Sequence, residues 1–192
     1  MSTLITNTIQ DVSTIKRSSS VTAATINSDG IVTLNQQPMF QLGGVTGTIA
    51  AAGVIPMKQL PAGGTVGDAD SFLLGGCTFN DGTSELTLAN AGRYMMSCTV
   101  LARTTSNNNQ MGPLKMQRKA AGGTYSSVTH SQLYKEAYDG SFNTFSATWV
   151  QNVAAGDVFR WINNNASHGV QFPTNATSGF VFNGFLLTTN VT

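Results

Sequence analysis

The chain has 192 residues, which is enough for one good core, or for one core and an arm. Only 10% of the residues are charged, against roughly 25% in typical soluble domains. The net charge is +1 and no basic run is longer than Lys16-Arg17, so a nucleic-acid groove is not expected. No apolar run reaches about 18 residues, so no membrane span is expected either. Abundant Gly, Ser, Thr and Asn indicate a β-rich, turn-rich structural protein and not a helical enzyme.

Residues 1–37 differ in composition from the rest of the chain, since they contain no aromatic residue and one glycine. Val21 to Ile26 and Ile31 to Leu34 flank Asn27-Ser28-Asp29-Gly30, a pattern that predicts a hairpin. The preceding residues fit a helix by spacing and an extended form by their β-branched content. The segment holds too little apolar surface to fold alone, so we interpret it as an arm that attaches to a larger partner; a disordered tail is the alternative. Its predicted contact residues are Leu4, Ile5, Ile9, Val12 and Ile15.

From Gln37 onward the pattern is one of short strands separated by glycine turns. An opening strand is predicted at Pro38 to Leu42, and a loop-like stretch follows from Gly43 to Gly67. No convincing amphipathic helix occurs, so the sequence predicts an all-β sandwich or barrel in residues 38–192. Further strands are expected at Ser71 to Phe79, Ser84 to Leu88, Arg93 to Ala102, Leu114 to Arg118, Phe142 to Trp149 and Val158 to Ile162.

The closing stretch, Ser178 to Leu187, carries large apolar side chains on both parities. Phe180 and Phe182 share one parity with Gly184, while Phe185 and Leu187 share the other. This predicts a central strand that is covered on both faces, with Gly184 allowing a neighbouring backbone or subunit to approach closely. Trp161 is expected in the core or an interface.

No catalytic or metal-binding set stands out. His130 and His168 lie far apart in polar contexts, and Cys77 and Cys98 lack zinc spacing. Cys98 is expected to be a buried thiol, and the sequence leaves open whether the two cysteines pair. Asp68 and Asp70 provide too few oxygens for calcium unless three chains combine theirs. We therefore expect no enzyme, no cofactor and no metal. Tyr134 and Tyr138, with Asn108 in another loop, are the candidate contacts for a receptor or glycan.

Four segments, in order along the chain, resemble C1q/TNF-like domains. They are Pro38-Met39-Phe40, the run from Cys77 to Tyr94 that ends in Ala91-Gly92-Arg93-Tyr94, the Gly156-Asp157 turn, and Phe182-Asn183-Gly184-Phe185-Leu186-Leu187. Leu86 and Ala89 replace the usual Phe and Pro of the family pattern. The resemblance implies a jelly-roll sandwich that forms a homotrimer, with Phe180, Phe182, Gly184, Phe185, Leu187 and Trp161 at the trimer interface or in the core.

The arm begins Met1-Ser2-Thr3-Leu4 and continues Asn7-Thr8-Ile9-Gln10. An arm of this type before a compact β domain, or knob, is similar to those of tailed-bacteriophage virion proteins. The first expectation is therefore a capsid decoration or cement protein, made in the host cytoplasm and displayed on the virion surface. In this role residues 1–37 would bind the major capsid protein. The alternatives are a tail or head fibre, whose arm binds an adaptor and whose knob binds a host receptor, and a secreted C1q/TNF-like ligand or lectin. The absent collagen-like repeat and signal-peptide pattern argue against the secreted ligand.

Overall fold

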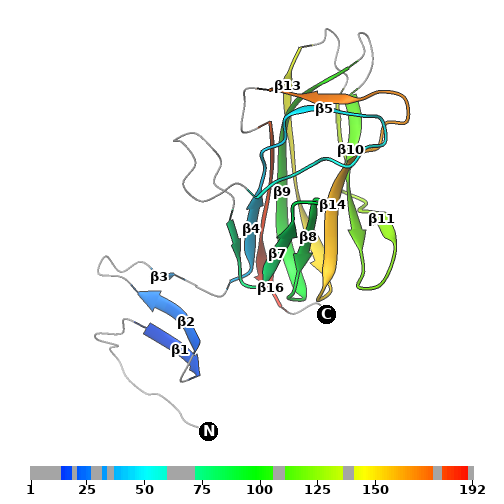
Figure 1. Ribbon diagram of the computed structural model, residues 1–192. Helices are drawn as coiled ribbons and strands as arrows, with labels where there is room; N and C mark the ends of the chain where they lie inside the picture. The colour runs from blue at the N-terminus through cyan, green and yellow to red at the C-terminus, as the bar shows by residue number, and fades with distance from the viewer. Residues whose placement is uncertain are drawn as a thin grey trace. The chain divides into compact units, whose positions relative to one another are not determined.

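The computed structural model describes residues 14–18, 21–26, 32–33, 37–59, 72–105, 111–135, 141–174 and 179–189. The chain divides into two compact units, Met1–Gln37 and Pro38–Thr192, and each unit is described here by itself. All regular elements in the described ranges are β-strands (Figure 1). This agrees with the all-β class that the composition and turn spacing predict.

The first unit contains a three-stranded antiparallel sheet made of β1 (Thr14–Ser18), β2 (Val21–Ile26) and β3 (Val32–Thr33), in that order. Strands β2 and β3 pair through Ile26 and Val32, on either side of the segment for which a hairpin turn is predicted. Among the predicted attachment residues, Ile15 lies in β1 opposite Ala24. Leu4, Ile5, Ile9 and Val12 lie outside the described residues.

The second unit is a sandwich of two antiparallel sheets. The larger sheet has the order β5-β15-β9-β16-β4-β6, and β13 pairs with the side of β9 that β16 leaves open. Its strands are β4 (Met39–Leu42), β5 (Gly47–Ile49), β6 (Phe72–Leu74), β9 (Gly92–Thr104), β13 (Asn143–Val153), β15 (Val170–Phe172) and β16 (Phe180–Thr188).

The smaller sheet has the order β11-β10-β14-β8-β7, and β12 also pairs with β10. It packs face to face with the larger sheet. Its strands are β7 (Cys77–Asn80), β8 (Glu85–Leu88), β10 (Met111–Lys119), β11 (Tyr125–Ser127), β12 (Leu133–Lys135) and β14 (Asp157–Asn163).

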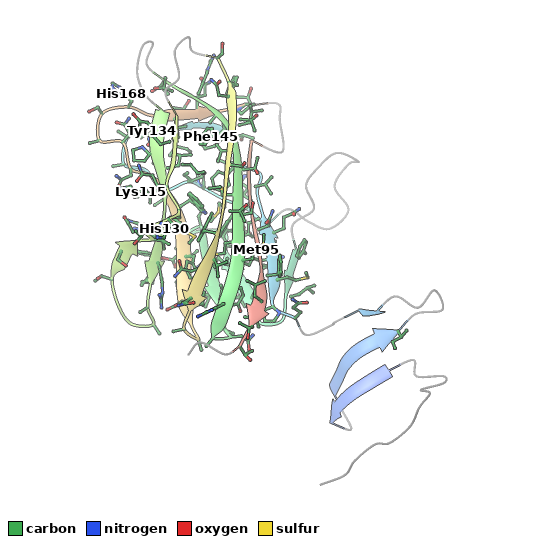
Figure 2. The ribbon with its side chains drawn as sticks, turned by 180° about the vertical axis from the view of Figure 1, so that it is seen from behind. Met95, Lys115, His130, Tyr134, Phe145 and His168 are labelled. Atoms are coloured by element: carbon green, nitrogen blue, oxygen red, sulfur yellow. The ribbon has the colours of Figure 1, made fainter. Side chains whose placement is uncertain are left out.

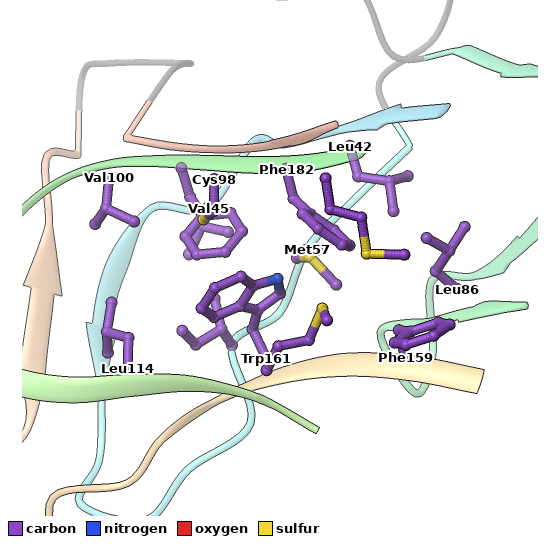
Figure 3. Close-up of a cluster of buried hydrophobic side chains, with 14 of the residues drawn as sticks. Leu42, Val45, Met57, Leu86, Cys98, Val100, Leu114, Phe159, Trp161 and Phe182 are labelled. Atoms are coloured by element: carbon purple, nitrogen blue, oxygen red, sulfur yellow. The ribbon is translucent and has the colours of Figure 1, made fainter. Parts of the chain in front are cut away.

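The core lies between the sheets because each strand alternates inward and outward side chains. Trp161 of β14 is at the centre of the cluster, fully buried, with its ring centroid 5.7 Å from those of both Phe180 and Phe182. Figure 3 shows Trp161 rising from the smaller sheet towards side chains of the larger one. Edge-to-face contacts of this kind add to the burial of apolar area, and they fix how the two layers sit on each other.

Two sequence-based boundaries are corrected by the structure. The run Ser71 to Phe79 was expected as one strand, but Gly75 and Gly76 have φ values of 61° and 86°. This left-handed turn, which glycine adopts without steric cost, separates β6 in the larger sheet from β7 in the smaller one. The stretch predicted to be loop-like, Gly43 to Gly67, contributes β5, in which Thr48 pairs with Gln171.

Candidate interaction surface

Strand β16 is central in the larger sheet, between β4 and β9, as its apolar content predicts. Its inward side chains Phe180 and Phe182 are completely buried. The outward side chains behave differently, because Phe185 is 37% exposed and Leu187 is 49% exposed. The chain by itself thus covers one face of this strand, and the other face is open to solvent.

Phe185 belongs to a row of apolar side chains that crosses five neighbouring strands. In the strand register, Leu74 pairs with Met39, Met39 with Phe185, Phe185 with Met95, and Met95 with Val150. Met39 is half-buried; Leu74, Met95 and Val150 are 44%, 37% and 58% exposed. We call these five residues the apolar row. Figure 2 views the molecule from the side of this sheet and labels Met95 on β9.

A polar row runs beside the apolar row, two residues along each strand. Gln41, Asn183, Ser97 and Thr148 pair directly across β4, β16, β9 and β13, and we call these four residues the polar row. The Thr148 hydroxyl donates to Ser97 Oγ at 3.3 Å. The outward face of the larger sheet is therefore apolar near one end of the strands and polar in the middle.

Strand β13 is the edge of the larger sheet beside this face. Its 11 residues pair with β9 in an unbroken register, and no strand in the described part of the chain pairs with its other side. Natural edge strands are protected by charges, proline, bulges or short length. Asn143–Val153 contains neither charge nor proline. In the described part of the chain this edge is therefore unprotected, apart from the Asn152 carbonyl, which accepts a hydrogen bond from Arg118 Nη1 at 3.4 Å.

A polar cleft of about 280 Å³ opens between β13 and the segment that follows β11. Trp149 Nε1 and Arg118 Nε, from two of the residues that line it, are buried N–H groups without an acceptor in the described part of the chain. Arg118 is held in place by the buried Asp157, with 2.6 Å from Nη2 to Oδ2. The same carboxylate accepts the Ala154 N–H at 2.7 Å. Val150, at the end of the apolar row, also lines this cleft.

The outward face of the smaller sheet is charged. Tyr125 donates a hydrogen bond to Glu85 Oε1, and Lys119 Nζ lies 3.5 Å from the same oxygen. The guanidinium of Arg160 lies 3.7 Å from the Tyr125 ring centroid, within the range of cation–π attraction. The hydrogen bond from Tyr125 lowers the pKa of Glu85, and burial raises the pKa of Tyr125. Among the residues that the structure describes, the apolar row lies on the outer face of the larger sheet, and the smaller sheet has no counterpart.

The predicted site residues are thus divided among several places. Phe180, Phe182 and Trp161 lie in the core, and Phe185 and Leu187 lie on the open face. Tyr134, in β12, is 46% exposed, whereas Tyr138 and Asn108 lie outside the described residues. Sequence reasoning missed four members of the apolar row, namely Met39, Leu74, Met95 and Val150.

The two cysteines are free and buried. Burial raises the pKa of Cys77 to about 11 and raises that of Cys98 well above its ordinary value, so both thiols stay protonated near neutral pH. In the described ranges no three His, Cys, Asp or Glu side chains gather as metal ligands, and no helix is long and apolar enough to cross a bilayer. Asp68 and Asp70 fall outside those ranges.

Comparisons with known proteins identify the fold. No protein-family profile and no curated protein sequence matches the chain. Among solved structures, it is similar to the Eiger TNF of S. frugiperda, with a TM-score of 0.58 and 14% identity over 82% of this chain and 96% of that one. It is also similar to murine APRIL, with a TM-score of 0.53 and 11% identity over 79% of this chain and 99% of that one. The second unit is therefore a TNF-like jelly-roll sandwich, as the sequence resemblance implies.

Proposed function

We propose that residues 38–192 act as a homotrimeric, non-enzymatic binding knob. The observation that carries the proposal is the apolar row on the open face of the larger sheet. Five large apolar side chains in direct cross-strand contact, all at least partly exposed, form the kind of surface that marks a protein contact. The TNF-like fold also supports a trimeric, non-enzymatic binding role.

The unprotected edge of β13 supports a cyclic arrangement. An edge strand and a sheet face are different surfaces, so a contact between the edge of one copy and the face of the next is heterologous. Such a contact closes into a ring when the rotation between copies is suitable. Completing the burial of the apolar row contributes about 1 kcal/mol per side chain, roughly half of the full transfer value, because about half of each is already covered.

We further propose that residues 1–37 attach this knob to a larger body. The chain divides into separate units at this point, and the sequence resemblance favours a virion surface, either as a capsid decoration protein or as a fibre. The fold fits a secreted ligand of the TNF type equally well. The location of the protein distinguishes these settings: hundreds of copies on a particle support decoration, a few to dozens support a fibre, and release as a free trimer supports a ligand.

The variant Met95→Lys tests the self-association. Met95 lies in the middle of the apolar row, between Phe185 and Val150, and its side chain points outward. A lysine there stays hydrated in a single chain but is costly to bury in an interface. We expect a folded monomer by light scattering coupled to size exclusion, with an unchanged circular-dichroism spectrum. Thr78→Lys is the control, since Thr78 is exposed in β7 of the smaller sheet, outside the proposed interface. A Met95→Lys protein that keeps the mass of the unchanged protein would refute the proposed interface.

A further inference from the structure

The polar row lies immediately beside the apolar row, on the same outward face. Asn183 of β16 is its central residue, and it pairs with Gln41 on one side and with Ser97 on the other. A face that only met solvent would not need the apolar row. A face that only buried apolar area would not carry an amide two residues from Phe185. The presence of both rows on one face therefore indicates that the polar row has a role beside the burial of apolar area.

The Asn183 carboxamide takes no part in the hydrogen bonds that the structure describes within the polar row. Thr148 donates to Ser97 at 3.3 Å, and Gln41 also takes part in an interaction. The Asn183 side chain is half-buried and has no hydrogen-bond partner in the part of the chain that the structure describes. Its carboxamide, with two donors and one acceptor oxygen, is available to a second chain.

Covering the apolar row would also remove water from Asn183, because the two rows are neighbours on one face. A buried amide without a partner costs free energy of the order of 1–3 kcal/mol. The amide can regain its hydrogen bonds only in an arrangement that brings a polar group of another copy against it. Apolar contacts alone tolerate sliding and alternative numbers of subunits, whereas a buried polar residue is known to fix register and oligomeric state in coiled coils.

We propose that Asn183, through the polar row, is the specificity-determining residue of self-association, and that it selects one stoichiometry and one register against the alternatives. The partner that it recognises is a second copy of this chain. This inference rests on the proposed function, since it assumes that the open face is the self-association surface.

Native mass spectrometry of the full-length Asn183→Leu protein tests the inference. Leucine extends the apolar row and removes the amide, so we expect association that is at least as tight but is spread over two or more stoichiometries. The unchanged protein is expected to give one. Thr78→Leu makes the same kind of change on an exposed residue of β7 in the smaller sheet, outside the proposed interface, and we expect it to keep the single stoichiometry.

The outcomes separate this inference from the proposed function. A single, unchanged stoichiometry for Asn183→Leu would overturn the role of Asn183 and leave the self-association intact. A monomeric unchanged protein would overturn both. If Asn183→Leu does not fold, Asn183→Ala removes the amide without adding bulk. For this variant a mixture of stoichiometries supports the inference, and one stoichiometry refutes it.

Discussion

Gly184 shows how one missing side chain shapes the centre of the larger sheet. A Cβ placed at Gly184 would lie 2.7 Å from a ring carbon of Phe40 and 2.8 Å from the carbonyl oxygen of Met95. The sequence predicts a close approach at this glycine, by a backbone or by another subunit. The structure identifies the neighbours as an aromatic ring from β4 and the backbone of β9, both within the same chain.

We expect Gly184→Ala to destabilise the fold by about 1–3 kcal/mol, the usual range for overpacking a core. Phe40 is completely buried, so its ring cannot move aside without disturbing its contact with Phe182, 4.9 Å away between centroids. Denaturant unfolding measures the change. Gly82→Ala is the control, because its new Cβ would meet only the Asn80 side chain of an exposed turn, at 3.3 Å. Equal stability of Gly184→Ala and the unchanged protein would contradict this packing.

Strand β13 has a long edge that no other described strand covers. In an antiparallel pair, alternate residues direct their N–H groups towards the partner strand. About half of the β13 amides therefore point away from β9, and no strand lies beside them in the described ranges. The strand has no charge and no proline to discourage pairing with another chain.

Hydrogen exchange over residues 143–153 tests whether another copy covers this edge. We expect slow exchange in the unchanged protein and fast exchange at about half of these amides in Met95→Lys, because the dissociated chain exposes the outward N–H groups. Residues 157–163 of β14, which lie inside the smaller sheet, provide the internal reference and should exchange slowly in both proteins. Identical exchange of residues 143–153 in the two proteins would show that the edge is not part of the interface.

The strands themselves could largely be predicted from alternation and turn residues. Alternation in the strand from Val158 to Ile162 places Phe159 and Trp161 on one face, and both are fully buried. The apolar row could not be predicted, because its members come from segments far apart in the sequence. Met95 and Val150 are 55 positions apart by number and become neighbours only through the register of β9 and β13. The single strand expected at Ser71 to Phe79 was wrong because the apolar run masks the turn at Gly75 and Gly76.

The two outer faces of the sandwich differ in the chemistry of their side chains. The smaller sheet carries the ion pair of Lys119 with Glu85 and the stacked Arg160 and Tyr125 on its outward side, where these groups are partly exposed. The larger sheet exposes the apolar row. An assembly that turns the larger sheets inward and the smaller sheets outward would bury the apolar groups and keep the charges in water, which is the arrangement that the hydrophobic effect favours.

The proposed larger partner would bind residues 1–37, and the fold of the second unit does not specify its identity. The TNF-like jelly roll supports many roles, since function resides in surfaces that are placed on a fold. The sequence resemblance supports the proposal of a virion surface protein, and the fold supports the proposal of a secreted ligand. Both proposals require residues 38–192 to associate with copies of themselves.

The mass of the unchanged protein in solution tests that requirement most directly. Light scattering coupled to size exclusion, over a range of concentrations, is expected to give three times the 20.2 kDa chain mass. A single species at the mass of one chain, with the apolar row open to water, would contradict the account.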